Sequence, residues 1–82
     1  MQVEMPFAVD RASGQTLIQQ VANGLKEAIV CGSYLSGSVL PTTREMAHAL
    51  GVGRVVVERA LAKLKMEGFI CPRPRVGSVV LP

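Results

Sequence analysis

The sequence predicts a mainly α-helical fold with a small β-hairpin, arranged as a winged helix-turn-helix of three helices followed by an antiparallel wing. Three observations indicate this fold class. Apolar residues recur at helical spacing in three successive segments. A turn containing glycine joins the last two of them, and two short β-prone runs follow, separated by a tip rich in proline and arginine. With 82 residues, the chain is long enough for one small domain.

The first helix is predicted over about residues 15–31, after an N-terminal lead-in of residues 1–14. The winged domain is expected to span residues 15–82. Apolar residues three and four positions apart form the stripe of a buried helix face. They are Leu17, Ile18, Val21, Ala22, Leu25, Ala28 and Ile29. Gly32 ends this helix, and a short strand near residues 38–40 would give the sheet a third, edge strand.

The second helix begins with a capping box. The Thr42 hydroxyl is expected to accept a hydrogen bond from the backbone N–H of Glu45, whose carboxylate reaches back to the N–H of Thr42. Gly51 stops the helix after about two turns. Its apolar face consists of Met46, Ala47 and Leu50.

The third helix follows the turn "GVG", with Gly53 at its cap, and continues to Gly68. Its apolar stripe consists of Val57, Ala60, Leu61 and Leu64. After Gly68 the pattern changes to "FICPRPRVGSVVL", which predicts a hairpin. Prolines stiffen the hairpin tip, and Gly77 gives the chain freedom to turn there.

Positive charge is concentrated in the second half of the chain. The net charge is +3, but residues 44–82 hold seven lysines or arginines and three glutamates, which gives +4, whereas residues 1–43 carry −1. The second half is therefore a candidate surface for a polyanion. A solvated surface with a slight basic excess is the alternative explanation.

Several function classes lack support in the sequence. A single histidine, His48, and no nucleophile motif or glycine-rich phosphate loop argue against an enzyme, and no metal or cofactor is predicted. Cys31 and Cys71 match no metal or redox spacing and are predicted to be reduced packing residues. No segment reads as a membrane span or a signal peptide, so we expect a soluble, cytoplasmic protein.

Three segments together resemble the amino-terminal DNA-binding domain of GntR-family bacterial transcription regulators. They are "LIQQVANGLKEAI", "SGSVLPTTREMAHALGVGRVVVERALAKLKMEGFI" and "PRVGSVV", within residues 15–80. The resemblance implies that this winged domain binds operator DNA as a homodimer. It also implies that a larger carboxy-terminal domain binds a small-molecule effector; because the chain ends at Pro82, that domain is expected to lie outside it.

The chain keeps two arginines of the family pattern, Arg44 and Arg54, and departs from the pattern elsewhere. The family has Ser or Thr at the position of Gly53 and polar residues at those of Val55 and Val56. It often has Arg in place of Glu58 and commonly has Gly in place of Arg75. These departures bear on which DNA sequence is bound more than on DNA binding itself.

Arg44 and Arg54 occupy helix amino termini, where the dipole makes an uncompensated cation unfavourable by about 0.3–1 kcal/mol. Two such placements predict that an anion lies at these termini. We expect Arg44 to bind backbone phosphate, and Arg54 to bind phosphate or a guanine edge. The spacing does not decide whether Val55 and Val56 face thymine methyl groups or turn toward the core.

The wing completes the predicted site, because Arg75 is expected to approach a narrow, A·T-rich minor groove. The predicted DNA-contacting residues are Thr42, Thr43, Arg44, Gly53, Arg54, Val55, Val56, Glu58, Arg73, Arg75, Val76 and Gly77. The predicted function is sequence-specific binding of double-stranded DNA by the head of a metabolite-responsive regulator, a repressor acting on a two-fold related operator. The alternative is a winged-helix protein-interaction module that uses the exposed valines.

Overall fold

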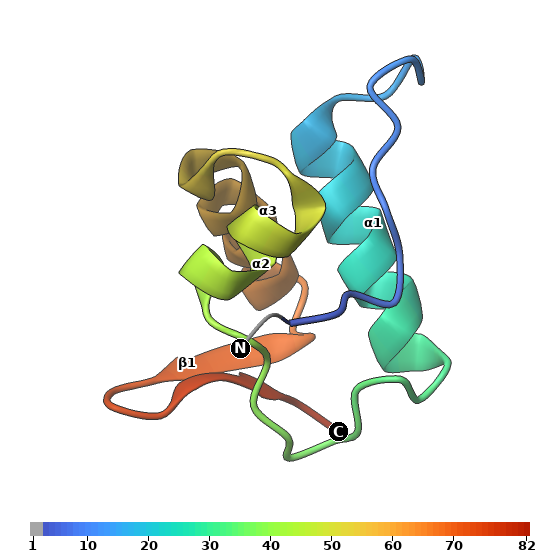
Figure 1. The fold of residues 1–82 in the computed structure, drawn as a ribbon. Coiled ribbons are helices and arrows are strands. Elements are labelled where there is room, and N and C mark those ends of the chain that lie inside the picture. The colour runs from blue at the N-terminus through green and yellow to red at the C-terminus, as the bar shows by residue number, and fades with distance from the viewer. Residues whose placement is uncertain (1–2) are drawn as a thin grey trace.

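A computed structural model describes residues 3–82 of the chain and contains the predicted elements in the predicted order (Figure 1). They are α1 (Leu17–Val30), α2 (Thr43–Leu50), α3 (Arg54–Met66), β1 (Ile70–Arg73) and β2 (Gly77–Val80). The strands pair antiparallel, with Ile70 opposite Val80 and Arg73 opposite Gly77. The winged helix-turn-helix prediction is therefore confirmed. Within the described residues, none of the helices has the length and apolar character needed to cross a membrane.

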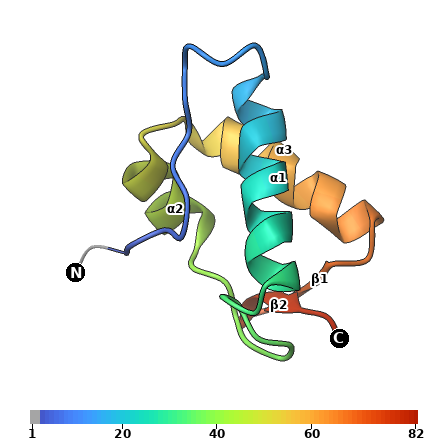
Figure 2. The ribbon, with the colours of Figure 1, turned by 90° about the vertical axis from the view of Figure 1, so that its right-hand side faces the viewer.

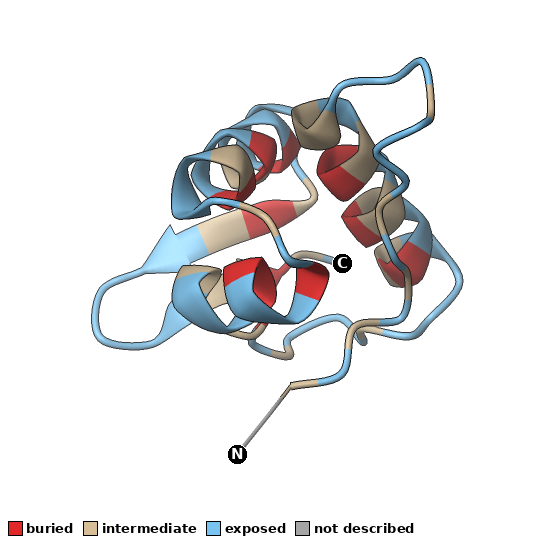
Figure 3. Cartoon of the chain, turned by 45° about the horizontal axis from the view of Figure 1, so that its top comes forward, coloured by how far each residue is buried: buried red, intermediate tan, exposed pale blue. Residues whose placement is uncertain are grey.

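The first helix is slightly shorter than predicted. Thr16 caps it by accepting a hydrogen bond of 3.1 Å from the N–H of Gln19, so α1 begins at Leu17. Its buried face contains the predicted residues Val21, Ala22, Leu25 and Ala28. This face packs against α3. The buried residues lie on the inward faces of the helices and the hairpin (Figure 3), and within residues 3–82 all of them are apolar.

The helix-turn-helix has the local geometry that its residues predict. In the capping box, the N–H of Glu45 lies 3.1 Å from Thr42 Oγ1, and the N–H of Thr42 lies 2.9 Å from Glu45 Oε1. Gly51 adopts a left-handed conformation with φ of 70°, which glycine accommodates without steric cost. The chain therefore turns at Gly51, and α3 begins three residues later, at Arg54.

The expected third strand near residues 38–40 is reduced to one isolated bridge, between Val39 and Val79. The segment does hydrogen-bond to β2, with Leu40 donating to the carbonyl of Ser78 at 2.9 Å. It stays short because Gly37 is left-handed (φ 85°) on one side and Pro41, which has no N–H, follows on the other. The wing is thus a two-stranded hairpin tied to the loop before α2.

The N-terminal segment is part of the packed domain. It runs alongside α1 in both ribbon views (Figure 1, Figure 2), and Met5, Phe7 and Val9 pack against the core. The Phe7 ring lies directly over Gly24 of α1, where a Cβ atom would overlap it. These contacts bring residues 3–9 across α1 to the neighbourhood of α2.

Candidate nucleic-acid interface

Two arginines stand in the first turns of α2 and α3. Arg44 is the second residue of α2 and Arg54 the first residue of α3, and both side chains are exposed. The start of α2 is balanced by Glu45. The start of α3 has neither a side-chain cap from Gly53 nor an acidic residue in its first turn. Free backbone N–H groups and a guanidinium therefore coincide at the start of α3, a combination that attracts anions.

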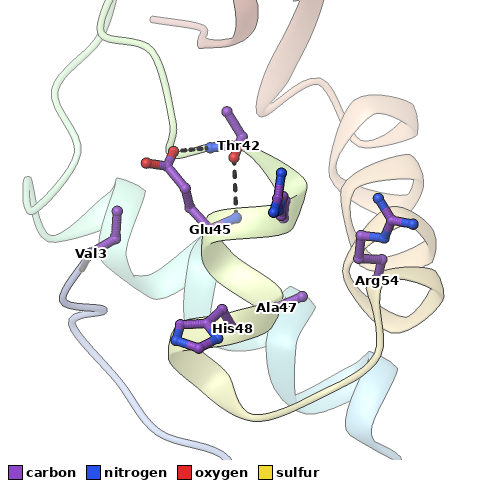
Figure 4. Close-up of a pocket in the computed structure, with 7 residues that line it drawn as sticks. Val3, Thr42, Glu45, Ala47, His48 and Arg54 are labelled. Atoms are coloured by element: carbon purple, nitrogen blue, oxygen red, sulfur yellow. Dashed lines mark hydrogen bonds between the residues drawn. The ribbon is translucent and has the colours of Figure 1, made fainter. Parts of the chain in front are cut away.

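One surface depression joins these two helix starts (Figure 4). Its lining comes from α2, from the start of α3 and from the N-terminal segment. The lining residues are Val3, Thr42, Arg44, Glu45, Ala47, His48 and Arg54. The structure thus places the predicted site residues Thr42, Arg44 and Arg54 around a common hollow, as expected if both helix starts address the same ligand.

The cations of this hollow are not neutralised by ion pairs within residues 3–82. The ion pair in this part of the chain joins Lys26 to Glu67 at 2.6 Å. The Glu45 carboxylate accepts a hydrogen bond from the Thr42 backbone in the capping box. Arg44 and Arg54 therefore retain their charge for an external anion.

The structure separates the three consecutive valines of α3. Val55 is 57% exposed, Val56 is half-buried and packs against the core, and Val57 is fully buried. The structure thereby answers the question that the spacing left open, namely which of Val55 and Val56 faces outward. Val55 faces outward beside Arg54, whereas Val56 turns toward the core.

A second groove separates α3 from the hairpin. Its lining includes the predicted site residues Thr43 and Glu58 and the basic residue Lys65 of α3. Glu58 is exposed one turn beyond Arg54 on α3, and no ion pair engages it within residues 3–82. Its carboxylate is therefore an available hydrogen-bond acceptor on the exposed side of the helix.

The wing tip is exposed from Pro72 to Gly77 (Figure 3). Arg75 has φ of 65°, a left-handed conformation that glycine adopts far more readily than arginine. This conformation explains why glycine suits the turn position at 75. Gly77 has φ of 118°, and a Cβ there would lie 3.1 Å from Val39 Cγ1. The positive φ and the close approach of Val39 are both consistent with the predicted role of Gly77 in the turn.

A third hollow connects the wing to the start of α2. Its lining includes Thr42 and Thr43 together with Val76 and Gly77. Seven of the twelve predicted site residues line these depressions. The other five do not: Gly53, Val55 and Val56 lie at the start of α3, and Arg73 and Arg75 are exposed on the wing. The helix starts and the wing thus form one continuous exposed region.

Two parts of this region were missed by the sequence analysis. His48 was not among the predicted DNA-contacting residues, yet it lines the hollow with both arginines. Val3 reaches the same hollow because the N-terminal segment docks along α1. A signal for His48 was present, since it lies four residues after Arg44 and so shares a face of α2 with it.

Other titratable groups lie away from the interface. Both cysteines are free, but Cys31 is exposed, so its predicted packing role is wrong: it caps α1 at the surface. The hydrogen bond between the Cys31 thiol and the Ser33 hydroxyl lowers the pKa of the Cys31 thiol. Burial raises the pKa of Tyr34, whose hydroxyl contacts Met5 Sδ at 3.7 Å.

Residues 17–80 match the bacterial regulatory proteins of the gntR family. The uncharacterized HTH-type transcriptional regulator YieP of Escherichia coli is 34% identical over 79 residues, which cover 95% of this chain and 34% of YieP. The Exu regulon transcriptional regulator of the same species is 44% identical over 61 residues, covering 74% of this chain and 24% of the relative. The chain therefore spans about a third or less of the length of these curated relatives.

Solved structures show the same fold. YtrA from Sulfolobus acidocaldarius, a GntR-family transcription factor, superposes with a TM-score of 0.83 at 35% identity, covering 90% of this chain and 63% of YtrA. The DNA-binding domain of AraR, solved in complex with operator ORR3, gives a TM-score of 0.79 at 22% identity. That alignment covers 96% of this chain and 95% of the AraR domain.

Proposed function

Since this chain belongs to the gntR family of bacterial regulatory proteins and is a DNA-binding regulator domain, not an enzyme, we propose that it recognises operator sequences by inserting the start of α3 into the major groove. The observation that carries the proposal is the shared hollow of Arg44 and Arg54, two cations at adjacent helix starts that form no ion pair within residues 3–82. The AraR domain, which has this fold, has been solved on its operator.

We assign roles to four exposed residues of the helix-turn-helix. Arg44 binds a backbone phosphate beside the start of α2, and Arg54 binds either a phosphate or the O6 and N7 acceptors of guanine. Val55 offers methyl groups to a thymine methyl group. Glu58, one turn further along α3, accepts a hydrogen bond from the amino group of cytosine.

The wing supplies the second contact region. Arg75 is held outward at the exposed tip, and Arg73 lies beside it at the end of β1. We assign Arg75 to the minor groove, where narrow A·T-rich segments concentrate negative potential. Thr42, Thr43, Val76 and Gly77 bridge the two contact regions along the phosphate backbone.

In the whole protein, two such domains bind a two-fold related operator, and a domain outside this chain senses a metabolite and controls repression. The curated relatives are transcriptional regulators of about three or more times the matched length, which supports this arrangement. A single domain is expected to bind weakly, since dimeric binding adds a second, effectively intramolecular contact.

Amide NMR shifts of this 82-residue domain during addition of a mixed-sequence duplex test the proposal, because the method tolerates weak binding. We expect shifts at Arg44, at residues 53–56 and at residues 73–77 that fade as salt is added. Arg59→Ala serves as the matched control for Arg54→Ala, because Arg59 is exposed on α3 outside the described hollows. No shifts at low salt, with the fold intact, would overturn the proposal in favour of a protein-interaction module.

A further inference from the structure

The hollow between α2 and α3 contains a third group that can carry positive charge. His48 lines the hollow from α2, with Ala47 between it and Arg54 of α3 (Figure 4). It is exposed, and no hydrogen bond or ion pair engages its side chain within residues 3–82. It is also the single histidine of the chain. The imidazole is therefore free to meet a ligand that enters this hollow.

We propose that a DNA backbone phosphate occupies the hollow and that His48 binds it as a protonated imidazole, so that DNA binding takes up a proton. The inference rests on the proposed function and adds to it a contact and a pH dependence. A phosphate beside an imidazole favours the protonated form. Histidine changes charge between about pH 5 and 8, within the range that cells and buffers reach.

The charges around the hollow fit an anion. On α2, Arg44 lies one turn before His48, and Glu45 has its carboxylate in the capping box. On α3, the charged group that lines the hollow is Arg54. In the N-terminal segment the charged side chains are Glu4, Asp10 and Arg11, and the Asp10 carboxylate accepts a hydrogen bond of 2.9 Å from the Ala12 N–H.

Arg11 bonds the carbonyl of Gly51 at the end of α2. Glu4 is exposed next to Val3. Cations thus approach the hollow from α2 and α3, and the carboxylate that lines it, that of Glu45, already accepts a backbone N–H.

Metal binding is a poorer explanation of this histidine. Within residues 3–82 no three His, Cys, Asp or Glu side chains gather closely enough to hold a metal ion. Two arginines in the same hollow would also repel a cation. The hollow therefore favours an anion, and its position beside Val55 at the start of α3 places that anion on the face assigned to DNA.

The test measures the affinity of the 82-residue domain for a rhodamine-labelled, mixed-sequence duplex of about 20 base pairs, long enough for two half-sites. Fluorescence anisotropy is recorded at constant low ionic strength from about pH 5.5 to about pH 7.0. Carboxylates remain ionised and an α-amino group remains protonated over most of this range. Wild-type affinity is expected to weaken roughly twofold to fourfold as pH rises, because an imidazole is already partly protonated in the free protein; uptake of one whole proton over this range would give roughly 30-fold.

His48→Gln removes the imidazole and keeps a polar side chain of similar reach, so the affinity of this variant for DNA is expected to be independent of pH. The matched control adds Ala49→His to His48→Gln. Ala49 is exposed on α2 but does not line the hollow, so a histidine there should not restore the pH dependence. Calorimetry in two buffers of different ionisation enthalpy should show proton uptake for the wild type and not for His48→Gln.

Two results overturn the inference and are distinguishable from each other. Parallel pH profiles for the wild type and His48→Gln, with salt-dependent binding intact, would show that His48 does not bind the phosphate. The proposed DNA-binding function would be unaffected. No binding by any variant at low salt, with the fold intact by circular dichroism, would remove the proposed function and the inference together.

Discussion

Arg11 Nη2 donates a hydrogen bond of 2.6 Å to the carbonyl oxygen of Gly51, the left-handed residue that ends α2. This contact joins two residues 40 positions apart and ties the N-terminal segment to the turn of the helix-turn-helix. The last carbonyl groups of a helix lack intrahelical partners, and a guanidinium is a favourable donor to them because the dipole's negative end lies there. The N-terminal segment therefore helps to hold the turn that positions α3.

Arg11→Ala is expected to lower the free energy of unfolding by about 1 kcal/mol, the usual net value of a solvent-accessible hydrogen bond. Chemical denaturation measures the change. Arg11→Lys keeps the charge and should recover part of the loss. Equal stability of all three proteins would show that the bond to Gly51 contributes nothing in solution.

Gly24→Ala is expected to destabilise the wild-type domain but to stabilise a Phe7→Ala variant. In the wild type the added methyl group collides with the Phe7 ring and should destabilise the domain by displacing the N-terminal segment. In a Phe7→Ala background the collision is gone, and alanine should stabilise α1 by about 0.8–1 kcal/mol through its higher helix propensity. Thermal melts of the four proteins form the cycle, and an additive cycle would contradict the packing of Phe7 on Gly24.

The features that the sequence predicted are local ones. The capping box of Thr42 and Glu45 spans three residues, and the stop at Gly51 depends on its own backbone conformation, so both are visible in a linear pattern. The docking of residues 3–9 and the bond between Arg11 and Gly51 depend on contacts between distant segments, for which the sequence has no short-range signal.

The remaining differences have the same origin. Helical spacing places Val55 and Val56 near the edge of the apolar stripe, and only the packing of α3 on the core decides that Val56 turns inward. In place of the strand expected at residues 38–40 there is a single bridge, because Gly37 and Pro41 limit pairing on both sides. The hollow containing His48 exists because α2, α3 and the N-terminal segment converge there.

Arg75→Gly is expected to stabilise the domain and weaken its DNA binding. Glycine relieves a left-handed residue, which is worth about 1 kcal/mol. The same change removes the cation assigned to the minor groove, so affinity should fall most for duplexes with A·T-rich flanks. Arg73→Gly is the matched control, because Arg73 lies in β1 and its backbone has no positive φ to relieve. If Arg75→Gly bound every duplex with unchanged affinity, Arg75 would not contact the minor groove.

Val55→Thr and Val56→Thr are expected to separate base recognition from stability. Val55 is 57% exposed, so a hydroxyl there should cost little stability and should alter the bases preferred in selection from a randomised duplex. Val56 packs against the core, so its hydroxyl should lower the free energy of unfolding by about 1–2 kcal/mol. The reverse pattern, with altered base preference for Val56→Thr alone, would contradict the outward placement of Val55.

Arg54→Ala is expected to weaken DNA binding more than Arg59→Ala, because Arg54 opens α3 at the hollow whereas Arg59 lies outside it. If Arg54 binds phosphate, affinity should fall for all duplexes and the slope of log affinity against log salt should decrease by about 1. If Arg54 reads guanine, the loss should be about 1–3 kcal/mol on the preferred site, and discrimination at one base pair should relax. Anisotropy titrations at several salt concentrations, on the selected site and on a mixed-sequence duplex, distinguish the two roles. An Arg54→Ala protein that matched Arg59→Ala in affinity, salt slope and base preference would show that Arg54 contacts neither phosphate nor base.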